Sequence, residues 1–138
     1  MKKYAYPASA DDYRQLARRR LPQFLFDYVD GGATDECTLA ANVTDWQSVS
    51  LRQRVLIDVN RIDTSTTLAG QHCSMPLALA PVGLAGMLAR RGEVQAARAA
   101  AALSVPFTLS TVGICSVDEV QAATPAPCWF QLYMLRDR

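Results

Sequence analysis

The chain has 138 residues, of which 50% are hydrophobic and 20% charged, a composition typical of a folded globular domain rather than a disordered segment. Its 14 Lys and Arg residues nearly balance 13 Asp and Glu residues, and a formal net charge of +1 does not indicate a nucleic-acid partner. The N-terminus lacks the apolar stretch of an export signal, and no run approaches the roughly 20 apolar residues of a membrane-spanning helix, so we expect a cytoplasmic protein.

Two helices are predicted near the N-terminus. Ser9 and Asp11 suit the N-cap of a first helix that runs to about Arg20. Pro22 suits the first turn of a second helix, which ends at the stop signal Gly31–Gly32. The apolar stripe predicted for this second helix consists of Phe24, Leu25, Tyr28 and Val29.

The chain is then predicted to change from helix to extended structure. A third short helix is expected from Thr34 to about Asn42. From Ser48 to Gly70 the sequence has no long helical period and includes a β-branched run, which favours extended structure with a small hairpin. We interpret residues 1–75 as a region of N-terminal helices followed by this hairpin.

Three short apolar runs follow, and helical segments separate them. Such runs suit strands that are buried on both faces. The runs are Leu77–Ala80, Phe107–Ser110 and Trp129–Tyr133. The first intervening helix is predicted from Gly92 to Leu103, and the second begins at Ser116, where Glu119 completes a capping-box pattern.

Strands that alternate with helices predict parallel strands and hence an α/β fold. A Rossmann sheet would need a Gly-x-Gly-x-x-Gly turn, which residues 80–86 do not supply. The units fit a (β/α)8 TIM barrel, but that fold takes about 250 residues. We therefore expect residues 76–138 to be the first units of a truncated barrel, with only the first three barrel strands and with open edges that disfavour stability in isolation. Arg136–Asp137–Arg138 follows the third strand with no closing helix, which supports truncation.

Barrel enzymes place their active sites at the C-terminal ends of the strands. At the first such end, a proline and a glycine within residues 80–83 expose backbone with little bulk, which would admit a flat ring, although an ordinary βα turn explains them equally well. Ser110, Gln131 and Tyr133 offer a hydroxyl, an amide and a phenol at the later ends. An unpaired buried amide costs about 1 to 3 kcal/mol, so Gln131 needs either a ligand or another barrel side chain as its partner.

Four blocks resemble, in the same order, the FMN-dependent 2-hydroxy-acid dehydrogenases and oxidases. The resemblance runs from Asp12 to Arg138. The blocks are Leu21–Ala33, Ser74–Gly83, Phe107–Thr111 and Trp129–Tyr133. Within the family the resemblance is strongest to the bacterial L-lactate dehydrogenase branch, because of Gly83–Ala97 and the closing Leu135–Arg138.

The resemblance implies an FMN-binding barrel and the oxidation of an L-2-hydroxy acid, L-lactate to pyruvate. The apolar stripe of its helix, taken alone, would make Tyr28 a core residue. The resemblance instead implies that Tyr28 binds the substrate carboxylate. Tyr133 would be the catalytic and substrate-binding tyrosine at the reacting hydroxyl. The implied cofactor-binding residues are Ala80, Pro81, Val82 and Gly83 through their backbone and Ser110 and Gln131 through their side chains.

Further properties of the family concern the full-length protein. In the family a histidine accepts the hydroxyl proton and the hydrogen on carbon 2 passes to the flavin. Because that histidine and the phosphate-binding loops belong to later barrel units, we expect this N-terminal fragment to be inactive by itself. The resemblance also implies a respiratory-chain electron acceptor, peripheral contact with the inner membrane and a homo-oligomer.

Two other interpretations stay open. The chain could be a non-catalytic remnant that acts as an interaction protein, and it should then be stable and monodisperse alone. It could also belong to another FMN- or phosphate-binding barrel, such as a type 2 isopentenyl diphosphate isomerase. The blocks around Asp27–Tyr28 and Gln131–Tyr133 argue against the isomerase.

The remaining polar residues predict no metal site. A single histidine and no Cys-x-x-Cys pair do not fit the common zinc patterns, so we expect reduced thiols at Cys37, Cys73, Cys115 and Cys128. His72 is expected in a polar turn over residues 70–73, away from any strand end, and is not expected to be the catalytic base. Arg90–Arg91 is expected in a solvated loop.

Overall fold

The computed structural model describes residues 7–134 and 136 of the chain. The chain divides into two compact units, Met1–Ile57 and Asp58–Arg138. The predicted absence of an export signal rests mainly on residues 1–6, and part of the closing Leu135–Arg138 block, including Asp137 and Arg138, also lies outside the described residues.

Helices α1 (Ala10–Arg20), α2 (Gln23–Asp30) and α3 (Cys37–Ser48) make up the first unit. A capping box opens α1, since the Ser9 Oγ accepts from the Asp12 N–H and the Asp12 carboxylate accepts from the Ser9 N–H. Pro22 is the N-cap of α2, and Gly31 follows its last residue. The first two predicted helices are therefore confirmed in position.

Two details of this unit differ from the prediction. The third helix begins at Cys37 rather than Thr34 and continues to Ser48. Thr34 and Glu36 have φ angles of 51° and 57°, in the left-handed region, so a right-handed helix cannot include them. Of the four residues in the predicted apolar stripe of α2, only Leu25 is buried. The other buried residue of this helix is Phe26, which the predicted stripe did not include.

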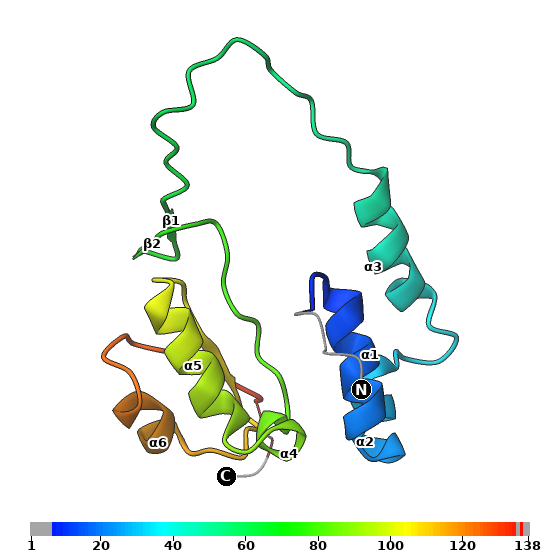
Figure 1. Cartoon of the computed structure of the whole chain (residues 1–138). Coiled ribbons are helices and arrows are strands. Elements are labelled where there is room, and N and C mark those ends of the chain that lie inside the picture. Colours follow the sequence, from blue (N-terminus) through cyan, green and yellow to red (C-terminus); the bar gives the residue numbers. More distant parts are fainter. Residues whose placement is uncertain (1–6, 135, 137–138) are drawn as a thin grey trace, which may run out of the picture. The chain divides into compact units, whose positions relative to one another are not determined.

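An antiparallel hairpin begins the regular structure of the second unit. Strands β1 (Thr66–Leu68) and β2 (Gln71–Cys73) pair across a turn at Ala69–Gly70. The predicted hairpin is thus present, but no strand forms between α3 and β1 (Figure 1). Leu51 and Leu56 in that segment are fully exposed, because extended chain without a partner strand buries nothing.

The parallel part of the fold is smaller than predicted. Strands β3 (Thr108–Ser110) and β4 (Trp129–Gln131) pair in parallel. In place of a strand over Leu77–Ala80, only Leu79 pairs, by donating its N–H to the Pro106 carbonyl at 2.8 Å and accepting from the Thr108 N–H at 3.0 Å. The ladder cannot continue on either side of Leu79, because Pro81 and, on the partner segment, Pro106 have no N–H at the next bonding positions.

Helices connect the parallel pairs, as in consecutive β/α units. Helix α5 (Gly92–Ala102) precedes β3, and α6 (Val117–Ala122) precedes β4. A short helix that the sequence did not predict, α4 (Ala85–Leu88), precedes α5 (Figure 1). Ser116 caps α6 by accepting from the Glu119 N–H at 3.2 Å, which is one of the two bonds of the predicted capping box. The Glu119 carboxylate pairs with Arg91.

One hydrophobic core fixes α5 and α6 against β3. It contains side chains from all three elements and from the loops between them. The buried members are Val94, Ala97, Ala100, Val105, Phe107, Leu109, Cys115 and Val120. Because Phe107 and Leu109 of the β3 region face this core, the intervening Thr108 and the following Ser110 face the opposite side of the strand.

Candidate functional site

The register of strands β3 and β4 places two of the predicted site residues directly opposite each other. Ser110 and Gln131 are direct partners in the parallel pair of β3 and β4. The Ser110 Oγ donates to the Gln131 Oε1 at 3.2 Å and accepts from the Val112 N–H at 3.3 Å. The Gln131 amide therefore has the partner that its position requires, and its Nε2 group makes no hydrogen bond within the described residues.

Thr111 connects the ends of these two strands. Its hydroxyl donates to the Gln131 carbonyl and accepts from the Tyr133 N–H at 3.1 Å. Tyr133, which is half-exposed, is therefore held through its backbone beside the Ser110 and Gln131 pair. Thr111 was not predicted as a site residue, and the only signal for it was its place directly after Ser110 at a strand end.

The predicted flavin-lining segment follows the Leu79 bridge. Ala80 and Val82 are exposed, and Pro81 and Gly83 are partly buried. Ala80 and Val82 border a cavity of about 290 Å³, which also touches α5 and β3. The cavity is lined by Leu79, Ala80, Val82, Ala85, Glu93, Ala96, Phe107, Thr108 and Ser110.

Glu93 is a buried carboxylate in this cavity that the sequence analysis did not single out. It is 2% exposed, and its Oε1 accepts from the N–H groups of Gly86 at 3.0 Å and Ile114 at 2.8 Å. Burial raises the pKa of this carboxyl, but the backbone N–H groups of Ile114, Glu93 itself and Gly86 outweigh burial and hold the pKa below its ordinary value. Glu93 is therefore ionised at neutral pH.

Cys115 lies next to this carboxylate. Burial, followed by the neighbouring Glu93 carboxylate, raises the pKa of the Cys115 thiol. A neutral, buried thiol is unreactive, so Cys115 is a packing residue here. All four cysteines are free, as predicted.

The residues at the strand ends fit one side of a flavin. The small side chains of Ala80 and Gly83 leave backbone accessible to a flat ring. The Ser110 hydroxyl and the Gln131 amide supply a donor and an acceptor of the kind that the polar edge of an isoalloxazine requires. The donor set and the exposed backbone agree with the predicted cofactor, whereas the role of each residue stays a prediction.

Two predicted assignments concern residues outside this cluster. Tyr28 lies on α2 in the first unit and is 55% exposed, so reading it as a core residue of that unit is wrong. Its predicted role at the substrate carboxylate stays a prediction. His72 is exposed and lies in β2 rather than in a turn, because it pairs with Thr67 of β1.

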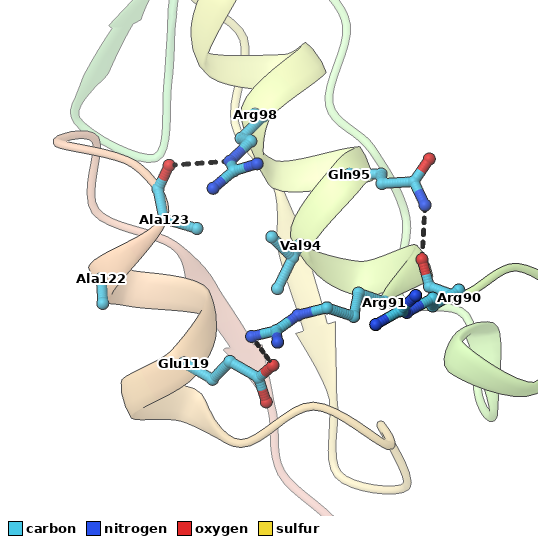
Figure 2. A pocket seen from close by; sticks show the side chains of 8 residues that line it. All are labelled: Arg90, Arg91, Val94, Gln95, Arg98, Glu119, Ala122 and Ala123. Atoms are coloured by element: carbon cyan, nitrogen blue, oxygen red, sulfur yellow. Dashed lines mark hydrogen bonds and ion pairs between the residues drawn. The ribbon is translucent and has the colours of Figure 1, made fainter.

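A second hollow, of about 470 Å³, lies between α5 and α6 (Figure 2). Arg91 pairs with Glu119 across it, and the Arg98 Nε donates to the Ala123 carbonyl at 3.4 Å. Arg90 and Arg91 are both exposed and precede α5, so the predicted solvated loop is confirmed, and Arg91 in addition makes a surface ion pair. These contacts join the two helices, so we interpret the hollow as a structural groove.

Over residues 7–134 and 136, no helix has the length and apolar character needed to cross a bilayer. A comparison with protein families matches residues 17–138 to the family described as FMN-dependent dehydrogenase. Among curated relatives, the "L-lactate dehydrogenase" of Caulobacter sp. (strain K31) is 66% identical over 131 residues, which cover 95% of this chain and 34% of that protein. The chain thus spans about a third of the length of the curated relatives it matches.

Two solved structures, of a mandelate oxidase and of an (S)-mandelate dehydrogenase, are similar in fold to this chain. A mandelate oxidase with (S)-4-hydroxymandelic acid is 37% identical with a TM-score of 0.88, over 95% of this chain and 37% of that one. The monotopic membrane protein (S)-mandelate dehydrogenase is 37% identical with a TM-score of 0.85, over 92% of this chain and 34% of that one. These structures support the expectation that the chain is part of a larger fold.

Proposed function

Because this chain belongs to the FMN-dependent dehydrogenase family, we propose that the protein carrying it oxidises L-lactate to pyruvate with FMN as its cofactor. The observation that carries the proposal is the Ser110 and Gln131 pair at the strand ends, where Ser110 lines the same cavity as Ala80 and Val82 of the predicted flavin-lining segment. The substrate class follows from the relatives named L-lactate dehydrogenase, which are similar over nearly the whole chain.

Each predicted site residue has a separate task in this proposal. Ser110 and Gln131 bind the polar edge of the flavin, and residues 80–83 support one face of its ring. Tyr133 donates a hydrogen bond to the reacting oxygen of the substrate, and Tyr28 binds the substrate carboxylate. When bound, FMN would take up the hydrogen that leaves carbon 2 of the 2-hydroxy acid.

Steady-state kinetics on the native protein tests the substrate and the reaction. With an artificial electron acceptor, we expect oxidation of L-lactate, with pyruvate as the product, and a much lower kcat/KM for D-lactate. Tyr133→Phe should lower kcat/KM for L-lactate about tenfold or more, because a hydrogen bond to the reacting oxygen is lost.

Tyr13→Phe is the matched control, since this exposed tyrosine of α1 has no predicted role in the site. It should leave kcat/KM for L-lactate unchanged. Preference for D-lactate, or a Tyr133→Phe variant as active as the Tyr13→Phe control, would contradict the corresponding part of the proposal.

We also propose peripheral membrane attachment for the whole protein. The support is the similar (S)-mandelate dehydrogenase, which is described as a monotopic membrane protein. Fractionation of native cells should recover the protein with membranes and release it with detergent. Recovery in the supernatant without detergent would contradict attachment. The electron acceptor and the homo-oligomer stay predictions.

A further inference from the structure

Two loops leave the C-terminal ends of the parallel strands and meet at one side chain. The first loop follows the Leu79 bridge and leads into α4, which contains Gly86. The second follows β3 and contains Ile114. The Glu93 Oε1 accepts hydrogen bonds from the backbone N–H groups of both residues.

We propose that Glu93 is a positioning residue of the flavin site, whose carboxylate fastens the first loop to the second and thereby fixes the backbone of residues 80–83 against the cofactor. This inference rests on the proposed function, since it assumes that the strand ends bind FMN. Glu93 itself would not touch the reacting atoms. It acts through the loops that it holds.

Close packing around the carboxylate supports this role. A Cβ atom on Gly86 would lie 2.7 Å from the Ile114 Cβ and 3.0 Å from the Glu93 Oε2. A Cβ atom on Gly92 would lie 2.5 Å from the Ala85 carbonyl oxygen. Glycine at both positions therefore lets α4, α5 and the second loop approach closely enough for one carboxylate to reach both loops.

The first loop has a backbone conformation that needs such support. Leu84 has a φ angle of 55°, in the left-handed region that is unfavourable for a residue with a side chain. Its N–H donates to the Val112 carbonyl of the second loop at 3.1 Å. Together with the two bonds to Glu93, this contact holds the loop in a conformation that it would not keep alone.

Charge explains why a carboxylate occupies this position. Glu93 lies in the first turn of α5, where the N-terminal end of the helix favours a negative group. Its Oε2 is buried and has no hydrogen-bond partner within the described residues, and Glu93 shares the wall of the cavity with Ala80 and Ser110. A neutral side chain of the same shape would form weaker bonds to the two N–H groups.

The test measures FMN affinity rather than turnover. FMN is titrated into the native apoprotein, and quenching of flavin fluorescence reports the Kd. We expect Glu93→Ala to raise the Kd about tenfold or more, and Glu93→Gln, which keeps an acceptor oxygen, to raise it by an intermediate factor. Glu119→Ala is the matched control, because this carboxylate pairs with Arg91 and accepts no hydrogen bond from Gly86 or Ile114, whose N–H groups both bond Glu93.

Hydrogen exchange separates local positioning from general instability. In the apoprotein of the Glu93 variants, amide exchange should accelerate in peptides that cover residues 83–87 and 112–116, while the core peptides of α5 exchange as in the control. If Glu93→Ala does not fold, Glu93→Gln decides the question alone. An unchanged FMN Kd in folded Glu93→Gln and in any folded Glu93→Ala variant overturns the role of Glu93. A native protein that binds no FMN overturns the proposed function itself.

Discussion

The hydroxyl of Thr111 has a larger role in the site than its place in the sequence suggests. It spans the ends of β3 and β4 by donating to the Gln131 carbonyl and accepting from the Tyr133 N–H. Because both hydrogen bonds are made to backbone groups, they fix the position of the Tyr133 backbone from which its side chain extends. We therefore infer that Thr111 positions the backbone of the proposed catalytic tyrosine.

Replacing Thr111 tests this role. Thr111→Val keeps the shape and removes both hydrogen bonds, so we expect the KM for L-lactate to rise about three- to tenfold through misplacement of Tyr133. Thr111→Ser keeps the hydroxyl and should behave like the unchanged protein. The measurement is steady-state kinetics on the native protein, and equal KM values for the Val and Ser variants would contradict the role.

Only some of the individual site residues could be predicted from the sequence. Ser110 and Gln131 were predicted because polar residues at the ends of buried apolar runs point to a strand-end site. Glu93 was missed because its partners are backbone N–H groups of Gly86 and Ile114, 7 and 21 residues away along the chain. Residue types alone do not show which backbone groups the fold brings to a side chain.

Elements with a local signal were predicted best. The signals for α1, α5 and α6 come from neighbouring residues: N-caps at Ser9 and Ser116, and the alanine-rich sequence of α5. Each of these helices begins within one residue of its predicted start. The parallel strand predicted at residues 77–80 depends on partners far along the chain, and only Leu79 pairs. The start of α3 was wrong because the left-handed conformation of Glu36 leaves no clear signal in the sequence.

Helices α1 and α2 are joined by an ion pair that responds to pH. Arg14 donates to both carboxylate oxygens of Asp30, at 2.5 and 2.9 Å, and this hydrogen bonding, against a smaller effect of burial, holds the Asp30 pKa below its ordinary value. A depressed folded pKa means that the pair stabilises the folded state above the unfolded pKa and that this contribution is lost as pH falls through the folded pKa.

The Arg14→Gln variant should therefore raise the Asp30 pKa toward its ordinary value and reduce the loss of stability on acidification. The pair is at the surface, so added salt should shrink the difference between the two proteins. A side-chain carboxyl titration by NMR gives the pKa directly. An Asp30 pKa that is the same with and without Arg14 would show that another group causes the shift. Asp11→Asn is a useful control, because Asp11 makes only a longer contact of 3.8 Å with Arg14.

Taken as a whole, this chain corresponds to one region of its longer relatives. It spans about a third of its relatives' length. Its described residues provide a polar pair and loops suited to one side of a flavin, and they include no cluster of His, Cys, Asp and Glu that would hold a metal. That the 138 residues alone do not oxidise L-lactate stays a prediction.

Anaerobic reduction of the flavin in the native protein tests whether L-lactate passes its hydrogen to bound FMN. Addition of L-lactate without an electron acceptor should bleach the visible absorption band of bound FMN and yield one pyruvate per flavin, while D-lactate should leave the band unchanged. A protein that contains no FMN, or whose FMN is not bleached by L-lactate, would contradict the account.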